Sequence, residues 1–289
     1  MSSKGLRRYQ RTHREAEPYV SLILTSTQNG VTTITLNNPA KLNGWTMRMM
    51  DEMKAALRHA GQDAETKVVI LTGTDPYYSA GVNLGQTVKP SHPRVLRQQI
   101  IEHNEGLFNA FLDFDKPIIA AVNGPAIGAS VTSATLCDML IASDKATFST
   151  PFFRLGVPPE GCSSVLFERL MGDNAKRILG EEGWRPTGTE AAECGLADQV
   201  VPHDQLLAQA QRIAEEWIAA GHVRTFRADS TRHELKAVNA RESVQVADAF
   251  LAAPFLREQY RFLKSKGKRR PAMLFLVLWK SRPLWSRML

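Results

Sequence analysis

The chain has 289 residues, of which 43% are hydrophobic and 22% charged, which suits a globular protein with a sizeable core. Its formal net charge of +7 raises the question of nucleic-acid binding. Most of that charge lies in residues 261–289, which hold nine basic side chains and no acidic one, whereas the rest holds 27 basic and 29 acidic residues. The distribution therefore excludes a basic nucleic-acid-binding face on the body of the protein.

The three cysteines, Cys137, Cys162 and Cys194, lack C-x-x-C spacing and are odd in number. They predict a reducing compartment, with neither a disulfide scaffold nor a bound metal. The longest apolar run, residues 272–279, is too short to cross a bilayer. The N-terminus has no apolar signal-peptide region, so we expect a flexible arm over residues 1–19.

In the first half of the chain, short apolar segments alternate with helical patterns. Residues 31–36 alternate in polarity, and residues 68–71 and 118–122 are continuous apolar runs, which predicts three strands. Helical patterns cover residues 46–61 and 100–111, between successive strands. Strands that alternate with helices indicate an α/β core.

After residue 202 the chain becomes mainly helical. Asp204 is expected to cap a helix whose apolar positions repeat at helical spacing. These positions are Leu206, Ala210, Ile213, Trp217 and Ile218. The sequence therefore predicts four parts, namely the flexible arm (1–19), an α/β core (20–202), a helical section (203–267) and a basic tail (268–289).

Two segments rich in small residues each follow a predicted strand. They are residues 78–84 (YSAGVNL) and residues 123–130 (NGPAIGAS), and the second leads into a helical run. Small residues at such a junction leave backbone N–H groups accessible, and two of these groups aimed at one point would form an oxyanion hole. A pair of tight turns without a ligand is the alternative, which spacing alone leaves open.

The motifs of other enzyme classes are missing. Gly128-x-Ser130-x-Thr132 differs from the G-x-S-x-G nucleophile elbow at its last position, and no Asp and His pair follows in a recognisable context. The chain has no P-loop, no G-x-G-x-x-G motif and no histidine cluster at metal-binding spacing. We therefore do not assign Ser130 as a nucleophile.

Glu160 stands in an unusual loop, LGVPPEGCSS (residues 155–164). Two prolines before it and a glycine after it fix the backbone, and an apolar helix follows. Partial desolvation in such a loop would raise the pKa of the carboxyl and make it a proton shuttle near neutral pH. Alternatively, Glu160 lies in the first turn of the helix, where the helix dipole would lower its pKa.

Together these motifs resemble the crotonase (enoyl-CoA hydratase/isomerase) superfamily over residues 20–265. The matching pieces are TLNNP (35–39) with Asn43, VILTG (69–73), SAG (79–81), KPIIAAVNG (116–124), Gly128, CD (137–138) and AECGL (192–196). The resemblance implies an α/β, crotonase-like spiral of ββα turns with a C-terminal helical trimerisation section. It also implies a homotrimer or a dimer of trimers, and an acyl-CoA substrate whose thioester oxygen binds the backbone N–H groups of Ala80 and Ala129.

The departures from the family pattern concern the reaction. Hydratases of the family carry two glutamates at the positions that Thr132 and Phe152 occupy here, so the resemblance argues against water addition. Glu160 falls where peroxisomal-type Δ3,Δ2-enoyl-CoA isomerases carry their single glutamate. Residues 150–164 and KAVNARE (236–242) also look like theirs. The implied reaction moves a double bond and needs no cofactor, because coenzyme A is part of the substrate.

The resemblance also implies a set of substrate-binding residues. These are Lys41, Asn43, Ser79, Gly81, Leu84, Gly128, Thr132 and Phe152. Lys41 is assigned to a phosphate of coenzyme A, with an ordinary exposed lysine as the alternative. The family relatives favour a peroxisomal location, with the mitochondrion and the cytoplasm as alternatives.

Three other interpretations stay open. The first is another crotonase-fold enzyme, a hydrolase or an atypical hydratase, in which Glu160 directs water. The second is a non-catalytic acyl-CoA-binding module. The third is a peripheral contact of the basic tail, with Trp279 and Trp285, with a membrane. The alternative for the tail is a disordered or lattice-contacting extension, whose deletion should leave folding nearly intact.

Overall fold

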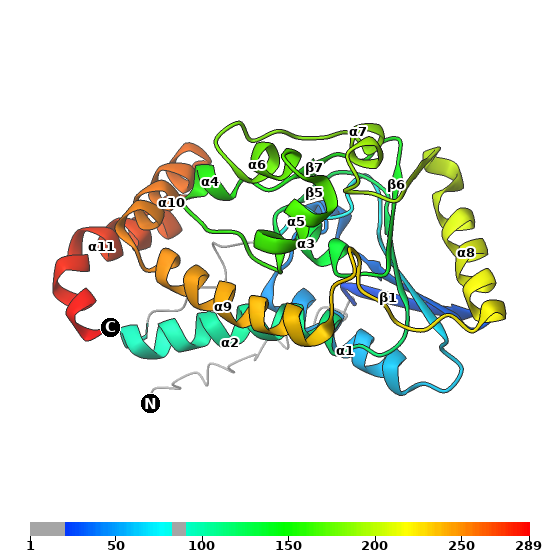
Figure 1. Cartoon of the computed structure of the whole chain (residues 1–289). Helices are drawn as coiled ribbons and strands as arrows, with labels where there is room; N and C mark the ends of the chain where they lie inside the picture. The colour runs from blue at the N-terminus through cyan, green and yellow to red at the C-terminus, as the bar shows by residue number, and fades with distance from the viewer. Residues whose placement is uncertain (1–20, 83–90) are drawn as a thin grey trace, which may run out of the picture.

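The computed structural model describes residues 21–82 and 91–289. The arm predicted for residues 1–19 and the predicted substrate residue Leu84 lie outside the described residues. A six-stranded sheet forms the centre of the molecule, with the strand order β1-β2-β3-β4-β6-β8 (Figure 1). The strands are β1 (Ile23–Gln28), β2 (Val31–Leu36), β3 (Val68–Gly73), β4 (Ile118–Val122), β6 (Met139–Ser143) and β8 (Gln199–Val201).

From β2 onwards all neighbouring strands of this sheet run parallel, whereas β1 and β2 are antiparallel. The three strands predicted from the sequence are present as β2, β3 and β4, but β1 was not predicted. Asn29 and Gly30 join β1 to β2 with positive φ angles of 52° and 79°. An Asn-Gly pair that adopts positive φ at both positions forms the tight hairpin loop typical of antiparallel strands, so this dipeptide was an available signal.

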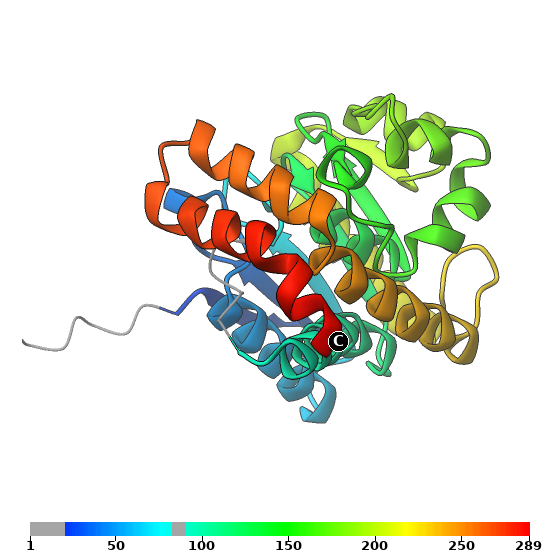
Figure 2. The same ribbon diagram turned by 90° about the vertical axis from the view of Figure 1, so that its left-hand side faces the viewer.

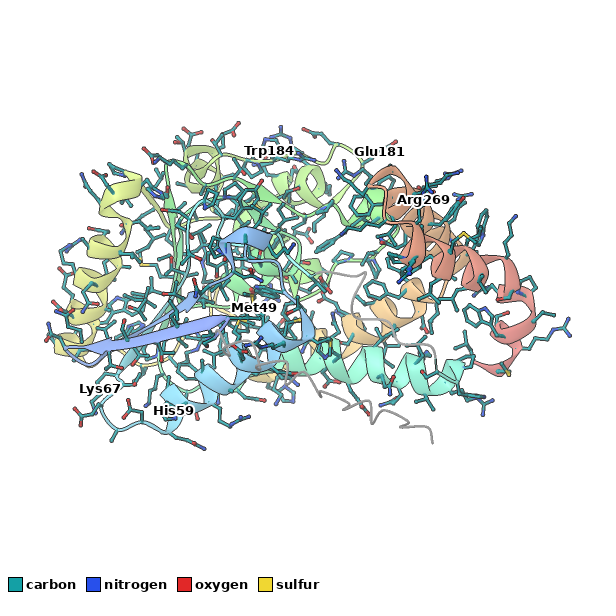
Figure 3. All side chains as sticks on the ribbon, turned by 180° about the vertical axis from the view of Figure 1, so that it is seen from behind. Met49, His59, Lys67, Glu181, Trp184 and Arg269 are labelled. Carbon is teal, nitrogen blue, oxygen red and sulfur yellow. The ribbon has the colours of Figure 1, made fainter. Side chains whose placement is uncertain are left out.

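One face of the sheet packs on α1 (Met47–Gln62), α2 (Pro93–Leu112) and the segments that follow β4 and β6. Helix α1 begins where the sequence predicted, because the side chain of Thr46 accepts a hydrogen bond from the N–H of Met49. The helix buries one apolar face, and Figure 3 shows Met49 on its inner side. The buried residues are Met49, Met50, Met53, Leu57 and Ala60. This face of the sheet carries the site described below.

The opposite face is covered by α8 (Leu206–Ala220), which stands alone on the right-hand side of Figure 1. The predicted apolar positions of this helix pack against Val31, Val68 and other side chains of the sheet. The predicted cap was wrong. Asp204 lies inside a short 3-10 turn, η3 (His203–Gln205), and α8 follows Gln205 without any side-chain capping bond.

Three long helices complete the chain, namely α9 (Arg232–Phe250), α10 (Ala253–Ser265) and α11 (Arg269–Trp285). Helix α9 runs along α2, and α11 lies beside α10, as Figures 1 and 2 show. Helix α11 corrects the expectation for residues 268–289, because the side chain of Phe275 is 2% exposed within an apolar cluster. The basic residues are therefore part of a packed helix, and Arg269 stands at its start among the C-terminal helices (Figure 3).

Short elements connect the larger ones. They are η1 (Pro39–Lys41), β5 (Ala126–Ile127), α3 (Ala129–Thr135), β7 (Phe148–Ser149), α4 (Phe152–Leu155), α5 (Ser163–Met171), α6 (Asn174–Leu179), α7 (Gly188–Glu193) and η4 (Ser286–Met288). Strands β5 and β7 pair in parallel as a separate two-stranded sheet. Among the described residues, no helix has the length and apolar character needed to span a membrane.

Candidate active site

Glu160 lies in the loop between α4 and α5, with its side chain directed into the protein. The residue is only 8% exposed. Burial raises the pKa of its carboxyl group to about 7, the nearby charge of Glu242 acts in the same direction, and a hydrogen bond from Asn104 opposes them. Glu160 therefore has the pKa of a group that can both accept and release a proton near neutral pH.

The partner of the Glu160 carboxylate comes from α2. Asn104 Nδ2 donates a hydrogen bond of 2.7 Å to Glu160 Oε2, and Ser243 Oγ on α9 donates one of 2.9 Å to Asn104 Oδ1. Ser243 thus orients the side-chain amide of Asn104, and that amide in turn binds Glu160. Neither Asn104 nor Ser243 belongs to a recognisable motif, so neither was predicted from the sequence.

A second buried carboxylate, Glu242 of α9, binds the start of α5. Its two oxygens accept hydrogen bonds from the N–H groups of Cys162 (2.6 Å) and Ser164 (2.9 Å). Glu242 therefore satisfies the backbone donors that every helix N-terminus leaves open. Of the two alternatives for Glu160, the structure supports the desolvated carboxylate, because Glu242 takes the helix-capping role.

The two segments rich in small residues lie side by side. Ser79 N donates to Pro125 O (3.2 Å), and Ile127 N donates to Ser79 O (3.0 Å). Gly81 has φ +75°, and a Cβ atom added to it would lie 2.3 Å from Ile127 O. Only glycine permits this close approach, so the two segments meet at Gly81, as the oxyanion-hole interpretation of the sequence requires.

The individual N–H donors differ from the prediction at one position. Ala80 N donates a 2.9 Å hydrogen bond to Leu42 O, and Gly81 N donates to Ser79 Oγ at 3.0 Å. The N–H of Ala80 is therefore occupied and does not face a ligand site, which corrects its assignment. The N–H groups of Val82 and Ala129 donate to no other residue in the parts of the chain that the structure describes.

Two further predicted substrate residues have structural roles instead. Asn43 is fully buried, and its side-chain amide binds Asn38 N, Thr74 O and Tyr77 O within 2.8 Å. Ser79 is also fully buried, and its Oγ donates to Asn43 O at 2.8 Å. Both side chains fix the loop that carries Gly81, and neither has a polar group left for a ligand.

The remaining predicted residues fall into two groups. Lys41 is exposed on η1, as both of its interpretations require. Phe152 and Thr132 are buried close to the other parts of the site. A Cβ atom added to Gly128 would lie 4.0 Å from the ring of Phe152, and one added to Gly161 would lie 2.6 Å from Thr132 Oγ1.

Ser130 is not a nucleophile in this structure. Its Oγ accepts a hydrogen bond from Ile127 N (2.9 Å) and contacts the carbonyl oxygens of Ile127 (3.0 Å) and Ser79 (3.2 Å). Its hydroxyl therefore fastens the turn between β5 and α3. Among the described residues, no group of three or more His, Cys, Asp or Glu side chains is placed to hold a metal ion.

A twisted sheet of mainly parallel strands, a smaller second sheet and a C-terminal helical section around a buried glutamate define a protein of the crotonase fold. The sequence model of the family described as "Enoyl-CoA hydratase/isomerase" matches residues 26–261, and the chain belongs to this family. The resemblance proposed from the sequence is thereby confirmed at the level of family and fold.

Three relatives illustrate the likeness. Enoyl-CoA delta isomerase 2 of Homo sapiens is 33% identical over 280 residues, which cover 89% of this chain and 66% of that protein. Peroxisomal enoyl-CoA delta isomerase 3 of Mus musculus is 30% identical, over 92% of this chain and 84% of that protein. The crystal structure of an enoyl-CoA hydratase/isomerase from Pseudoalteromonas atlantica has a TM-score of 0.70 and 27% identity, over 85% of this chain and 98% of that one.

Proposed function

We propose that the protein is a Δ3,Δ2-enoyl-CoA isomerase in which Glu160 is the only proton shuttle. The observation that carries the proposal is a buried carboxyl group with a pKa of about 7, held in a loop beside Thr132. The human and mouse relatives named as enoyl-CoA delta isomerases support the reaction type.

The chemistry needs one group that accepts and then returns a proton. The carboxylate of Glu160 removes a proton from C2 of a 3-enoyl-CoA, the electron pair of that C–H bond forms the C1–C2 double bond of a dienolate, and the carbonyl π electrons move to the thioester oxygen. The negative charge spreads to the thioester oxygen. When the thioester carbonyl re-forms, the C1–C2 π electrons become the C2–C3 double bond and the C3–C4 π electrons take the proton back from Glu160 at C4. The product is the 2-enoyl-CoA, with atoms and charge balanced.

The oxyanion of the dienolate requires N–H donors. We assign this role to the backbone N–H groups of Val82 and Ala129, which come from the two adjoining segments and have no acceptor among the described residues. Val82 replaces Ala80, whose N–H is bonded to Leu42. Fixed backbone donors stabilise charge that develops during the reaction without any reorganisation of the protein.

Neither of the two positions at which hydratases of the family carry a glutamate holds a carboxylate here, because these positions are Thr132 and Phe152. Phe152 is a buried hydrocarbon ring, and the hydroxyl of Thr132 donates to the carbonyl oxygen of Ala129 at 3.3 Å. Among the residues that the structure describes, Glu242 is the other buried glutamate, and both of its oxygens bind the start of α5. These roles favour isomerisation over hydration.

Product analysis tests the proposal. The purified protein should convert a 3-enoyl-CoA to its trans-2-enoyl isomer, while crotonyl-CoA should yield negligible 3-hydroxybutyryl-CoA. Hydration or thioester hydrolysis at a rate similar to isomerisation would contradict it.

The acidity of C2 comes from the thioester, so we also propose that no cofactor takes part. Activity should therefore survive dialysis against a chelator.

Location and assembly extend the proposal. The mouse relative is named as peroxisomal, which supports the same location for this protein. Imaging of an N-terminally tagged chain with a peroxisomal marker tests this, and a mitochondrial or diffuse signal would contradict it.

We further propose a homotrimer or a dimer of trimers, to be tested by light scattering of the purified protein.

A further inference from the structure

Helix α11 lies at one end of the molecule, on the side opposite α8 (Figure 1), and Figure 2 shows it in front of the rest of the chain. It begins at Arg269, beyond residue 261, where the match to the family ends. Its inner face packs on the other C-terminal helices and buries Ala272 and Phe275. The helix is therefore an addition that family membership does not supply, with one side fixed by the fold.

The opposite side of α11 bears a row of exposed apolar and basic side chains. They follow one another at intervals of three or four residues, and such positions share one face of a helix. We call them the outer stripe, and they are Arg270, Met273, Val277, Lys280 and Leu284. Its three apolar members are 54%, 57% and 78% exposed. A helix that packs one apolar face usually turns a polar face to solvent, so these three side chains suit a partner and not the fold.

Basic residues surround the outer stripe. Residues 261–289 hold nine Lys and Arg side chains and no acidic one. Most of the nine are exposed and form no ion pair within the described part of the chain, namely Lys264, Lys266, Lys268, Arg269, Arg270, Lys280 and Arg287. Positive charge that the protein itself does not compensate favours an anionic partner.

The combination of hydrocarbon and positive charge selects among the possible partners. A second copy of α11 would bring two strongly basic surfaces together, which like-charge repulsion opposes. A nucleic acid would neutralise the charge but offers no hydrocarbon surface to Met273, Val277 and Leu284. An anionic membrane offers both, because charged headgroups lie directly above the acyl chains of the lipids.

We propose that α11 docks the protein on the surface of an anionic membrane, with the apolar side chains of the outer stripe among the headgroups and the surrounding basic side chains against the lipid charges. Within the described residues no helix can span a bilayer, so the contact is peripheral. The trimer proposed above comes from the family, whose match ends at residue 261, and it does not require α11. Docking is also independent of the isomerase reaction, so either proposal can fail without the other.

Cosedimentation of the full chain with lipid vesicles tests the charge requirement. The vesicles are pure phosphatidylcholine or a mixture of phosphatidylcholine and phosphatidylserine. Each Lys or Arg near an anionic surface strengthens binding by about fivefold, so the protein should bind the mixed vesicles at least about tenfold more tightly. Salt that shortens the Debye length from about 10 Å to about 3 Å should release most of the bound protein. Equal binding to both vesicles, or binding to neither, would overturn the proposal.

A matched pair of double variants locates the charge on α11. Arg270→Gln combined with Lys280→Gln removes two positive charges from the outer stripe and should weaken binding to the mixed vesicles by about tenfold or more. Arg58→Gln combined with Lys145→Gln makes the same charge change at exposed positions elsewhere and should have little effect. Equal losses in the two variants would show that net charge acts without a defined docking surface, and would contradict the proposal.

A second pair tests the apolar contact. Val277→Ser combined with Leu284→Ser keeps the charge of α11 but removes hydrocarbon from the outer stripe, and should weaken binding to the mixed vesicles by about tenfold. Leu207→Ser combined with Val223→Ser makes a matched change at exposed positions on and after α8, and should leave binding unchanged. Full binding by the Val277 and Leu284 variant would indicate a purely ionic contact with any polyanion and would overturn the proposal.

Light scattering separates the membrane from a second copy of the chain. The Val277 and Leu284 variant should keep the oligomeric state and the thermal unfolding temperature of the wild type, because both side chains are exposed on the surface. An oligomer that dissociates in this variant would make the outer stripe an interface between copies, and would contradict docking on a membrane.

Discussion

Asn104 Nδ2 and Glu160 Oε2 are joined by a hydrogen bond of 2.7 Å between α2 and the loop before α5. The amide donates to the carboxylate and thereby favours its charged form, against the burial that raises the pKa of Glu160 to about 7. A lone carboxylate in an apolar environment would have a still higher pKa and would rarely be ionised at neutral pH. Asn104 thus holds the group near the pKa at which one residue serves as base and acid in turn.

Asn104→Leu should therefore shift the pH dependence of kcat/KM. Without the donor, the charged form of Glu160 is less stable and its pKa rises, so the acidic limb of the profile moves to higher pH. The rate at pH 6 should fall by about tenfold, with partial recovery above pH 8. Gln99→Leu, an exposed change on the same helix, is the control. A uniform loss at every pH would indicate a merely structural role for Asn104.

Glu160→Gln tests the shuttle itself. The substitution keeps the shape of the side chain but removes the proton acceptor, so kcat should fall by about 10²–10⁴-fold. Acyl-CoA affinity should stay nearly constant, because the proposed oxyanion donors belong to the backbone. Glu168→Gln, at an exposed position of α5, serves as the matched control. If Glu160→Gln kept more than about a tenth of the wild-type rate, another residue would have to be the base.

The sequence predicted the elements whose burial follows a simple period. Strands β2 and β4 have the predicted bounds, since alternating or continuous apolar runs mark a sheet covered by helices. The restricted loop that carries Glu160 could also be predicted from the sequence, because the prolines and the glycine beside Glu160 limit its backbone locally. Asn104 could not be assigned in this way. Its contact with Glu160 joins residues 56 apart in the sequence and depends on how α2 packs beside α9.

Two errors have physical reasons. The choice of Ala80 over Val82 as a donor concerns the direction of backbone N–H groups, which the pattern of side chains does not record. Residues 268–289 were predicted as a basic tail because of their charge, although their apolar residues also recur at a helical spacing. Ala272, Phe275 and Leu278 recur every three residues, and all three contact the apolar cluster of the C-terminal helices. Amphipathic spacing was therefore the better guide than net charge.

Phe275→Ala should show that α11 is part of the fold. The ring is almost fully buried and packs edge-on against Phe255, with 6.4 Å between the ring centroids. Its removal should lower the free energy of unfolding by about 3–5 kcal/mol, measured by urea denaturation. Met273→Ala on the same helix, at a residue 54% exposed, should have almost no effect. Equal stabilities of the two variants would restore the view of residues 268–289 as a dispensable tail.

The raised pKa of Glu160 also has a consequence for stability. The pKa of its carboxyl rises from 4.5 to about 7 on folding, so the folded state binds a proton more tightly than the unfolded state does. The free energy of unfolding therefore falls as the pH increases from about 4.5 to about 7, by about 3 kcal/mol for this group.

The side chain introduced by Glu160→Gln is neutral at every pH, so the variant does not lose this stability. The variant should be more stable than the wild type by about that amount at pH 8, and the difference should disappear near pH 4.5. Thermal unfolding of both proteins across this range measures the effect, with Glu168→Gln as a control that should follow the wild type. A Glu160→Gln variant that is less stable than the wild type at pH 8 would show that the carboxylate is well stabilised in the fold and lacks the raised pKa on which the proton shuttle depends.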